Sequence, residues 1–347
     1  MPEGAGHFRR LGVAVAALWL AVTPAAAPAE GWSQAEIPRQ WSFPRDHGAH
    51  PEYATEWWYF TGTLADASAG HYGYQLTIFR VGLRLEAGDS GNPWSVRDVY
   101  LAHFALTEVG ASRFRYADRT SRAGPGLAGA SSAGLDVWVL DWSARQEGRV
   151  LRLQADTPEM ALDLALTPRK PVVLHGEGGL SRKGPNPGQA SYYASITDLA
   201  TGGRIRTEPG GATVPVTGTS WFDHEFGSNQ LAEDQAGWDW FSLHLSDGQD
   251  LMLYLLRRKD GTVEPASSGT LVSPSGTARH LPREAFAVEP LSHWTSPRTG
   301  GRYPARWRLR VPAAEIDLTV ASLVADQELV TAGSTGVVYW EGIVAGG

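Results

Sequence analysis

The chain has 347 residues, of which 42% are hydrophobic and 19% charged, so it can bury one large core or two medium ones. Its formal net charge is -7 and it has no block of Lys or Arg beyond the N-terminal segment, which excludes a nucleic-acid backbone as its partner. Cysteine is absent, so disulfide bonds, thiolate sites and a lipid anchor on cysteine are excluded as well.

The N-terminal segment has the layout of a secretory leader. Arg9 and Arg10 precede an apolar run over residues 11–22, and small Ala-rich residues follow it. This pattern predicts a signal peptide over residues 1–29 and a periplasmic or secreted protein. The apolar run is shorter than the roughly 20 residues that span a bilayer. We therefore expect no integral membrane protein after cleavage; an uncleaved N-terminal anchor is the alternative.

The rest of the chain alternates short strands with turns. Forty Gly and 22 Pro are spread along it, and no long amphipathic helix pattern occurs. Period-two or apolar runs predict strands over 74–79, 99–106, 135–140, 151–155, 162–166, 192–196, 238–245, 251–256, 269–271, 307–311, 316–320 and 337–340. The Gly-rich stretch 202–218 predicts a boundary between an N-terminal domain, residues 30–210, and a C-terminal domain, residues 211–347.

One Trp-led pattern occurs twice. Residues 57–66 and 238–247 both read W-x-[YW]-F-[TS]-x-x-L-x-D, and a second apolar strand follows each. An Asp-His pair precedes each copy, Asp46-His47 and Asp223-His224. An offset of that size indicates duplication of a whole domain rather than a solenoid repeat. Closely spaced antiparallel strands close into barrels or pack as sandwiches, so we predict an all-β protein with two barrels side by side.

The alternation of a strand assigns the aromatic residues to two faces. It places Trp57 and Tyr59 on one face and Trp58 and Phe60 on the other. One face is expected to line a cavity for an apolar ligand. The alternative is that these rings only fill the barrels and their contact.

Asp223 is the strongest candidate for chemistry. It stands with His224 among aromatic residues, and such surroundings raise the pKa of a carboxyl group, so that it can act as a general acid near neutral pH. The alternative role is to order a loop by accepting backbone N–H groups. His103 lies mid-strand, either facing a cavity or satisfied within the core.

Other common catalytic patterns are missing. The His residues fit no H-E-x-x-H spacing, and the sequence contains no G-x-S-x-G elbow, phosphate loop or dinucleotide fingerprint. We therefore expect no metal and no cofactor.

Several motifs together resemble the AttH/CrtC-like family, lipocalin-like secreted proteins often described as predicted secreted hydrolases. The motifs span roughly residues 40 to 345 and read FPRDHGAHP at 43–51, EWWYFTG at 56–62, LAHFALT at 101–107, HGEGG at 175–179, QASYY at 189–193, SWFDHE at 220–225 and YWEG at 339–342. The resemblance implies two tandem lipocalin-like antiparallel β-barrels. It also implies that relatives continue beyond Gly347, which leaves open whether the C-terminal domain is truncated or ends naturally.

Carotenoid 1,2-hydratases are members of this family, and the resemblance implies a role for particular residues. An Asp in their motif matching Trp221-Phe222-Asp223 is thought to protonate an alkene, so Asp223 is the implied acid. Trp221, Trp238 and Trp240 would be the rings beside the resulting cation. We thus expect Asp223 and His224 to be catalytic, and Trp57, Tyr59, His103, Trp221, Trp238 and Trp240 to bind the ligand.

These observations favour a protein that binds an elongated apolar molecule, an isoprenoid such as a carotenoid or a lipid, and adds water to it by acid catalysis. A second hypothesis, implied by secreted relatives, is a non-enzymatic lipid carrier that serves an ABC exporter. A secreted hydrolase is the third.

Overall fold

The computed structural model describes residues 13–18, 31–85, 96–229, 232, 234–331, 334 and 336–347. Most of the predicted signal peptide lies outside these residues. Within them the chain forms strands and three short 3-10 helices, η1 (Arg45–His47), η2 (Arg283–Ala285) and η3 (Pro312–Ala314). No helix in these ranges is long and apolar enough to cross a membrane. The prediction of an all-β, lipocalin-like protein is confirmed.

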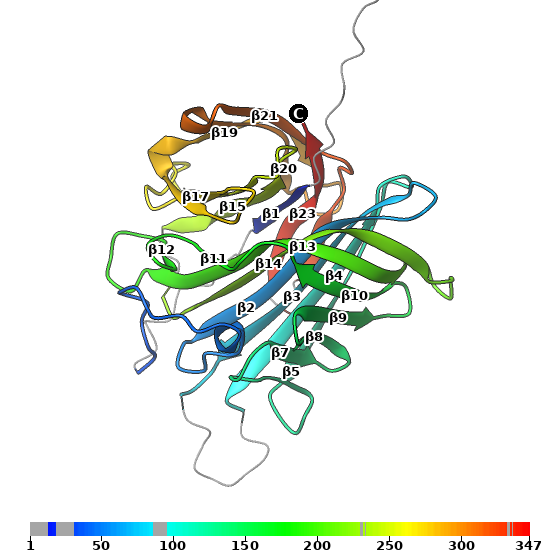
Figure 1. Cartoon of the computed structure of the whole chain (residues 1–347), viewed down its shortest axis with the longest axis horizontal. Helices are drawn as coiled ribbons and strands as arrows, with labels where there is room; N and C mark the ends of the chain where they lie inside the picture. Colours follow the sequence, from blue (N-terminus) through cyan, green and yellow to red (C-terminus); the bar gives the residue numbers. More distant parts are fainter. Residues whose placement is uncertain are drawn as a thin grey trace, which may run out of the picture.

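The first sheet curls into a barrel-like body (Figure 1). Neighbouring strands are antiparallel, and the sheet nearly closes around a core to which strands from β2 to β10 contribute. Its spatial order is β5 (Arg113–Arg122), β4 (Asp98–Glu108), β3 (His71–Gly82), β2 (Thr55–Ala65), β14 (Val214–Gly227), β13 (Ala190–Arg206), β10 (Ala161–Pro168), β9 (Val150–Asp156), β8 (Trp142–Glu147), β7 (Asp136–Val139) and β6 (Ala128–Ala130), with β11 (Val173–Leu174) and β12 (Leu180–Arg182) also paired to β13.

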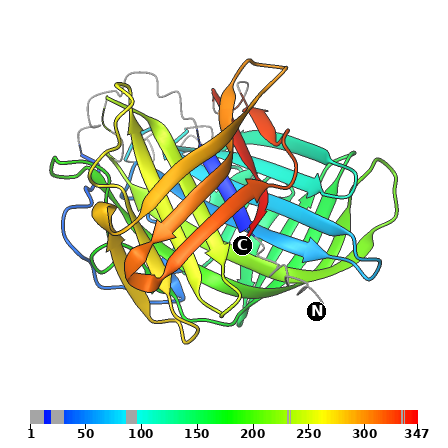
Figure 2. The same cartoon turned by 90° about the horizontal axis from the view of Figure 1, so that it is seen from above.

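The second sheet forms another curved body, drawn from yellow to red beside the first in Figures 1 and 2. Its order is β18 (Ala278–Pro282), β17 (Ser268–Val272), β16 (Asp250–Arg258), β15 (Gln235–His244), β1 (Val13–Leu18), β23 (Val337–Gly346), β21 (Ile316–Ser322), β20 (Arg302–Val311) and β19 (Ala287–Thr295), with β22 (Glu328–Thr331) also paired to β23. Strand β1 lies between β15 and β23 and is antiparallel to both. A segment of the predicted leader thus occupies a strand position in the sheet.

The repeated motif forms the same element in both bodies. Its first copy is β2, which makes a hairpin with β3, and its second copy is β15, which makes a hairpin with β16. Phe60 and Phe241, at equivalent positions of the two copies, are each buried in the core of their own sheet. The Asp-His pairs are not equivalent, because Asp46 and His47 lie in η1 whereas Asp223 and His224 lie in β14.

The Gly-rich stretch over residues 202–218 is a hairpin within the first sheet. It spans the end of β13 and the beginning of β14, and β14 continues from there between β13 and β2. Gly203 and Gly218 lie against the backbone of neighbouring strands, where a Cβ atom would collide with a carbonyl oxygen. The chain therefore changes sheets after β14, beyond the expected boundary at residues 210 and 211.

Candidate functional site

An aromatic cluster fills the contact between the two sheets. Residues of β2, β13 and β14 meet residues of β15 and β16 there, and we call this set the inter-barrel cluster: Trp57, Tyr59, Tyr193, Trp221, Trp238, Trp240, Met252, Tyr254 and Leu256. Tyr59 and Trp240 stand at equivalent positions of the repeat, and their rings are in edge contact at 5.2 Å. The face carrying Trp57 and Tyr59 thus lines the contact between the bodies, while Trp58 and Phe60 pack in the first core.

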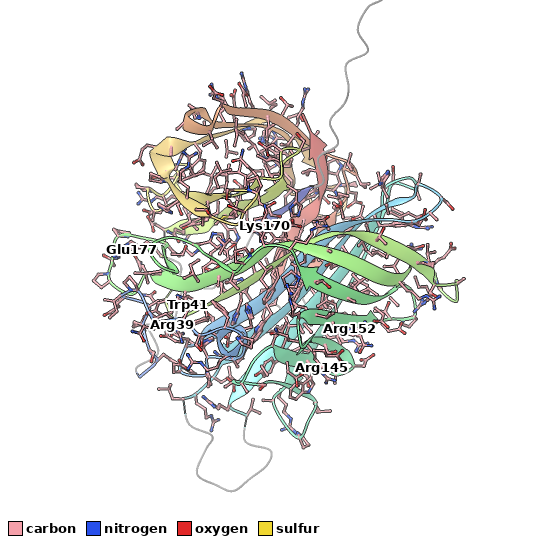
Figure 3. The ribbon with its side chains drawn as sticks, in the orientation of Figure 1. Arg39, Trp41, Arg145, Arg152, Lys170 and Glu177 are labelled. Carbon is pink, nitrogen blue, oxygen red and sulfur yellow. The ribbon has the colours of Figure 1, made fainter. Side chains whose placement is uncertain are left out.

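Buried polar pairs also join the two bodies. Lys170, labelled in Figure 3, donates to Asp250 at 2.7 Å across this contact, and both side chains are buried. Thr197 donates to the same carboxylate oxygen at 2.6 Å. Because a buried charge is tolerated only when it is paired and hydrogen-bonded, this pair fixes how the two sheets meet.

Asp223 lies at the edge of the inter-barrel cluster and is only 4% exposed. Its Oδ1 accepts from Trp221 Nε1 at 2.6 Å and from the Ser195 hydroxyl, and its Oδ2 accepts from the Tyr193 hydroxyl at 2.7 Å. All three donors are side chains, so the described structure does not use this carboxyl group to order backbone N–H groups.

A chain of hydrogen bonds leads from Asp223 into the second sheet. His175 contacts Ser195 Oγ through Nε2 at 2.6 Å and Thr270 Oγ1 through Nδ1 at 2.8 Å. Burial lowers the pKa of His175 to about 3, and Lys183 and His280 add to this effect, so the ring is neutral at pH 7. Since Ser195 donates to Asp223, it accepts from Nε2–H, and Nδ1 accepts from Thr270.

Burial decides the charge of Asp223. It raises the pKa of this carboxyl group to about 7, although hydrogen bonds from Ser195, Tyr193 and Trp221 oppose the rise. A substantial fraction of the molecules therefore carries a proton on Asp223 at neutral pH. A buried carboxylic acid beside electron-rich rings can donate a proton to an apolar substrate and stabilise the cation that forms.

His224 lies on the opposite face of β14 and does not contact Asp223. Its Nε2 is 2.9 Å from Glu56 Oε1, its Nδ1 is 3.1 Å from the carbonyl oxygen of Asp46, and its ring stacks on Trp58. The Glu56 carboxylate is also hydrogen-bonded to His50 Nδ1 at 2.9 Å and accepts a hydrogen bond from Arg80 Nε at 3.1 Å. Asp223 and His224, the two residues expected to be catalytic, thus belong to two separate hydrogen-bond networks.

The group of His50, Glu56 and His224 has the donor types of a metal site, and its ligand atoms lie within 4.8 Å of one another. However, Arg80 pairs with the Glu56 carboxylate, and the His50 backbone N–H also donates to it at 3.0 Å. A guanidinium on the shared carboxylate disfavours a divalent cation at the same point. We interpret these residues as a buried salt-bridge network that anchors the segment before β2.

The remaining predicted residues lie at the contact between the two sheets, Trp57 and His103 on the first sheet and Trp238 on the second. Trp57 and Trp238 are half-buried at the margin of the inter-barrel cluster. His103 contacts the Tyr339 hydroxyl of the second sheet through Nδ1 at 2.7 Å, and burial lowers its pKa to about 4. His103 thus faces the contact between the bodies, away from the inter-barrel cluster around Asp223.

Residue-level reasoning did not single out Tyr193, Ser195, His175 or Glu56. Each contacts its partner across strands from a distant part of the chain, which no local spacing reveals. Tyr193, His175 and Glu56 do fall inside motifs of the family resemblance, and that was the available signal.

A family model described as AttH-like matches residues 34–346. The chain belongs to the AttH-like family. The inter-barrel cluster and Asp223 lie within the matched region, whereas β1 precedes it.

Solved structures agree with this assignment. A putative AttH from Nitrosomonas europaea is 31% identical with a TM-score of 0.79, covering 90% of this chain and 98% of its own. Kievitone hydratase from Nectria haematococca is 15% identical with a TM-score of 0.63, covering 91% and 96%. CghA is 14% identical with a TM-score of 0.53, covering 97% of each chain. The last two show a shared fold alone. No curated protein sequence matches the chain.

Proposed function

We propose that this AttH-like protein binds an elongated apolar molecule between its two barrels and adds water to a carbon–carbon double bond of that molecule, with Asp223 as the acid. The observation that carries the proposal is a buried carboxyl group, held only by side-chain donors and bordered by Trp221 and Tyr193, whose pKa burial raises to about 7. The fold that it shares with kievitone hydratase supports the same reaction class.

The reaction begins with transfer of the Asp223 proton to one alkene carbon, which leaves a carbocation on the other. The faces of Trp221 and Trp240 stabilise this cation. A water molecule then attacks it, and the proton released from that water returns to the Asp223 carboxylate, so the enzyme is regenerated. When Asp223 is protonated, one of the two hydroxyl groups, that of Tyr193 or that of Ser195, accepts its proton, and it donates to the carboxylate again once the proton has left, because a hydroxyl group serves as donor or acceptor.

The ligand is proposed to enter at Trp57 and Trp238. These two rings are the half-buried members of the inter-barrel cluster, whereas Trp221 and Trp240 are buried. The interior of the first barrel is filled by large buried side chains such as Trp142, which favours the contact between the bodies over the barrel interior. An isoprenoid or an acyl lipid has the required shape, and the predicted leader supports the periplasm as the proposed location.

The test compares cargo in the wild type and in Asp223→Asn. Both proteins are purified from the periplasm and examined by native mass spectrometry and lipid extraction, with Asp239→Asn as a control that removes a different, half-buried acid. We expect hydrated product in the wild type and in the control, and unhydrated substrate in Asp223→Asn, with unchanged circular dichroism.

Two outcomes would overturn the proposal. Identical cargo in all three proteins would show a carrier, as expected for an accessory protein of an exporter. Folded protein without any apolar cargo, even after incubation with isoprenoids, would contradict ligand binding itself.

A further inference from the structure

A buried ion pair lies beside Asp223 and has no part in the reaction described above. Lys183, which follows β12, places its ammonium nitrogen 2.9 Å from Glu225 Oε1 of β14, and the two side chains are only 8% and 7% exposed. We call them the Lys183–Glu225 pair. Because removing two charges from water costs about as much as their attraction returns, a buried ion pair contributes little to stability. Its burial therefore needs an explanation other than stability.

The Lys183–Glu225 pair lies on the same face of the first sheet as Asp223. Asp223 and Glu225 are two residues apart in β14, so their side chains point to one face from Cα atoms about 7 Å apart. Glu225 pairs in register with Tyr193, whose hydroxyl donates to Asp223 Oδ2 at 2.7 Å. The Lys183 ammonium group lies over the rings of Tyr193 and Tyr254, at 5.3 Å and 4.3 Å from their centroids. One tyrosine thus contacts both the ammonium group and the acid.

The two charges of the pair act on Asp223 in opposite directions. Burial raises the pKa of Asp223, and the Glu225 carboxylate adds to this rise because a second negative charge nearby is unfavourable. Burial lowers the pKa of Lys183, but Glu225 outweighs burial, and Tyr254 and Asp223 add to its effect, so the ammonium group is charged at pH 7. This positive charge attracts the Asp223 carboxylate. Glu225, which also accepts from the Ser191 hydroxyl, neutralises it.

Other titratable groups surround Asp223 without changing this balance. On the faces packed around it they are Tyr59 of β2, Tyr193 of β13, His175 after β11, His244 of β15, Tyr254 of β16 and Glu341 of β23. Burial raises the pKa values of the tyrosines on β2 and β13 well above the usual range, and His175 is neutral. His244 Nδ1 lies 2.9 Å from Asp250, whose charge Lys170 neutralises. These groups leave the charge balance at the acid to the Lys183–Glu225 pair.

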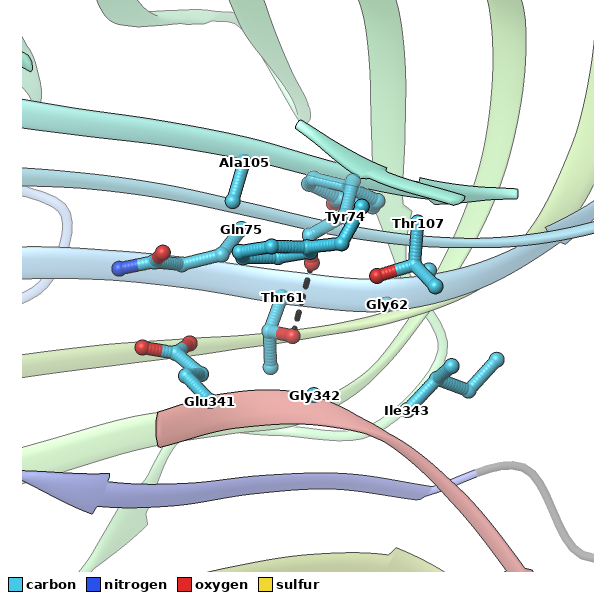
Figure 4. Close-up of a pocket in the computed structure, with 11 residues that line it drawn as sticks. Thr61, Gly62, Tyr74, Gln75, Ala105, Thr107, Glu341, Gly342 and Ile343 are labelled. Carbon is cyan, nitrogen blue, oxygen red and sulfur yellow. Dashed lines mark hydrogen bonds between the residues drawn. The ribbon is translucent and has the colours of Figure 1, made fainter. Parts of the chain in front are cut away.

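Glu341 is a second buried acid at this contact, and it is neutral as well. The Tyr59 hydroxyl donates to its Oε1 at 2.6 Å. Burial raises the pKa of Glu341 to about 8, although this hydrogen bond opposes the rise. Figure 4 shows its carboxyl group on the side of the Gln75 amide, between β3 and β23. Glu341 is thus mostly uncharged at pH 7 and adds little to the electrostatic potential at Asp223.

We propose that Glu225 is a positioning residue for the hydration: by binding Lys183 it neutralises the ammonium charge beside Tyr193, so that Asp223 keeps the proton it gives to the alkene. This inference rests on the proposed role of Asp223 as the acid. Neither member of the pair needs to touch the substrate. Loss of Glu225 would leave the ammonium group to stabilise the Asp223 carboxylate, whereas loss of Lys183 would leave a second carboxylate beside the acid.

Carbon-13 NMR titration of the Asp carboxyl groups measures the proton on Asp223 without any substrate. The full chain is labelled in Asp, and the Asp223 signal is the one missing from Asp223→Asn. We expect Glu225→Gln to lower the measured pKa of Asp223 by about 1 or more, and Lys183→Met to raise it. The double variant, which removes both charges, should titrate close to the wild type. Glu264→Gln is the matched control, because Glu264 is a buried partner of Arg258 outside the inter-barrel cluster.

The same titration of Asp223 in the wild type and in all three variants would overturn the inference, because a purely structural pair changes stability without moving the acid in opposite directions. Shifts of the same sign in Glu225→Gln and Lys183→Met would overturn it too. If Glu225→Gln does not fold, Lys183→Met and the double variant still decide, since their titrations must differ. The expected titration without any hydrated cargo would overturn the proposed function and leave the role of the pair intact.

Discussion

Three buried carboxyl groups in this protein respond differently to burial because their partners differ. Glu56 faces two histidines and the Arg80 guanidinium, and its pKa lies well below the usual range even though burial opposes this. Asp223 and Glu341 have only neutral donors, so burial prevails and raises their pKa values to about 7 and about 8. The sign of each shift follows from the charge of the neighbours rather than from burial alone.

This contrast predicts how stability depends on pH. Between about pH 4 and pH 8 the folded state keeps protons on Asp223 and Glu341 that the unfolded state has lost, so their contribution to the free energy of unfolding falls as pH rises. Each unit of pKa difference corresponds to about 1.4 kcal/mol. Glu56 acts in the opposite direction, and its contribution is lost only in acid, as pH falls towards its lowered pKa.

Urea denaturation at a series of pH values measures this effect. We expect the free energy of unfolding of the wild type to decline between pH 7 and pH 8, where buried histidines such as His103 and His175 are neutral in both states and no longer oppose the two carboxyl groups. The decline should be smaller in Asp223→Asn and Glu341→Gln, and smallest in the double variant. The same slope in all four proteins would contradict the assigned protonation states.

At the scale of elements, β2 and β15 show why a repeated sequence forms a single site. Each strand sends one face into its own core and the other into the contact between the bodies, so the two copies bring four aromatic residues together: Trp57, Tyr59, Trp238 and Trp240. Neither hairpin alone could bury this face. The site therefore requires both halves of the chain.

Close approach between β3 and β23 predicts the effect of one substitution. A Cβ atom on Gly73 would lie 2.9 Å from Cβ of Ile343, which is closer than such atoms pack. Gly73→Ala is expected to destabilise the protein by about 1–3 kcal/mol, because the second sheet must shift on the first. Differential scanning calorimetry measures this change, with Gly110→Ala as the control, since nothing lies within 4 Å of that position. Equal changes in stability for both substitutions would show that β23 can move away from β3 at no measurable cost.

The sequence predicted strands and their faces well, because alternation is a local property. Runs such as Leu151–Ala155 and Leu162–Leu166 lie in strands, and the face assignment of Trp57 and Tyr59 is confirmed. The sequence did not reveal which residues far apart in the chain contact each other. Glu341 meets Tyr59 across 282 residues, and glycines that allow strands to approach closely looked like a domain boundary.

For the whole molecule, the position of β1 means that cleavage of the predicted leader would remove a strand from the second sheet. The strand pairs with β15 over six residues and with β23 over five, yet all of it lies in the predicted leader. Removal of residues 1–29 is therefore expected to weaken the second sheet, because each net hydrogen bond contributes about 0.5–1.5 kcal/mol.

Hydrogen exchange measured by mass spectrometry tests this expectation on the full chain and on the chain that begins at Glu30. Amides of β15 and β23 should exchange faster in the shorter chain, while those of β2 and β3 serve as an internal control and remain unchanged. Unchanged protection of β15 and β23 would show that β1 contributes nothing to the sheet.

The edge contact between Tyr59 and Trp240 also carries information about origin. In a symmetric dimer, a residue near the twofold axis touches its own copy in the partner subunit. Here equivalent positions of two repeats touch within one chain. Duplication and fusion of the gene for a homodimer would produce this arrangement. After fusion the two halves can change independently of each other. One half can then carry the acid Asp223 while the other supplies rings that face it.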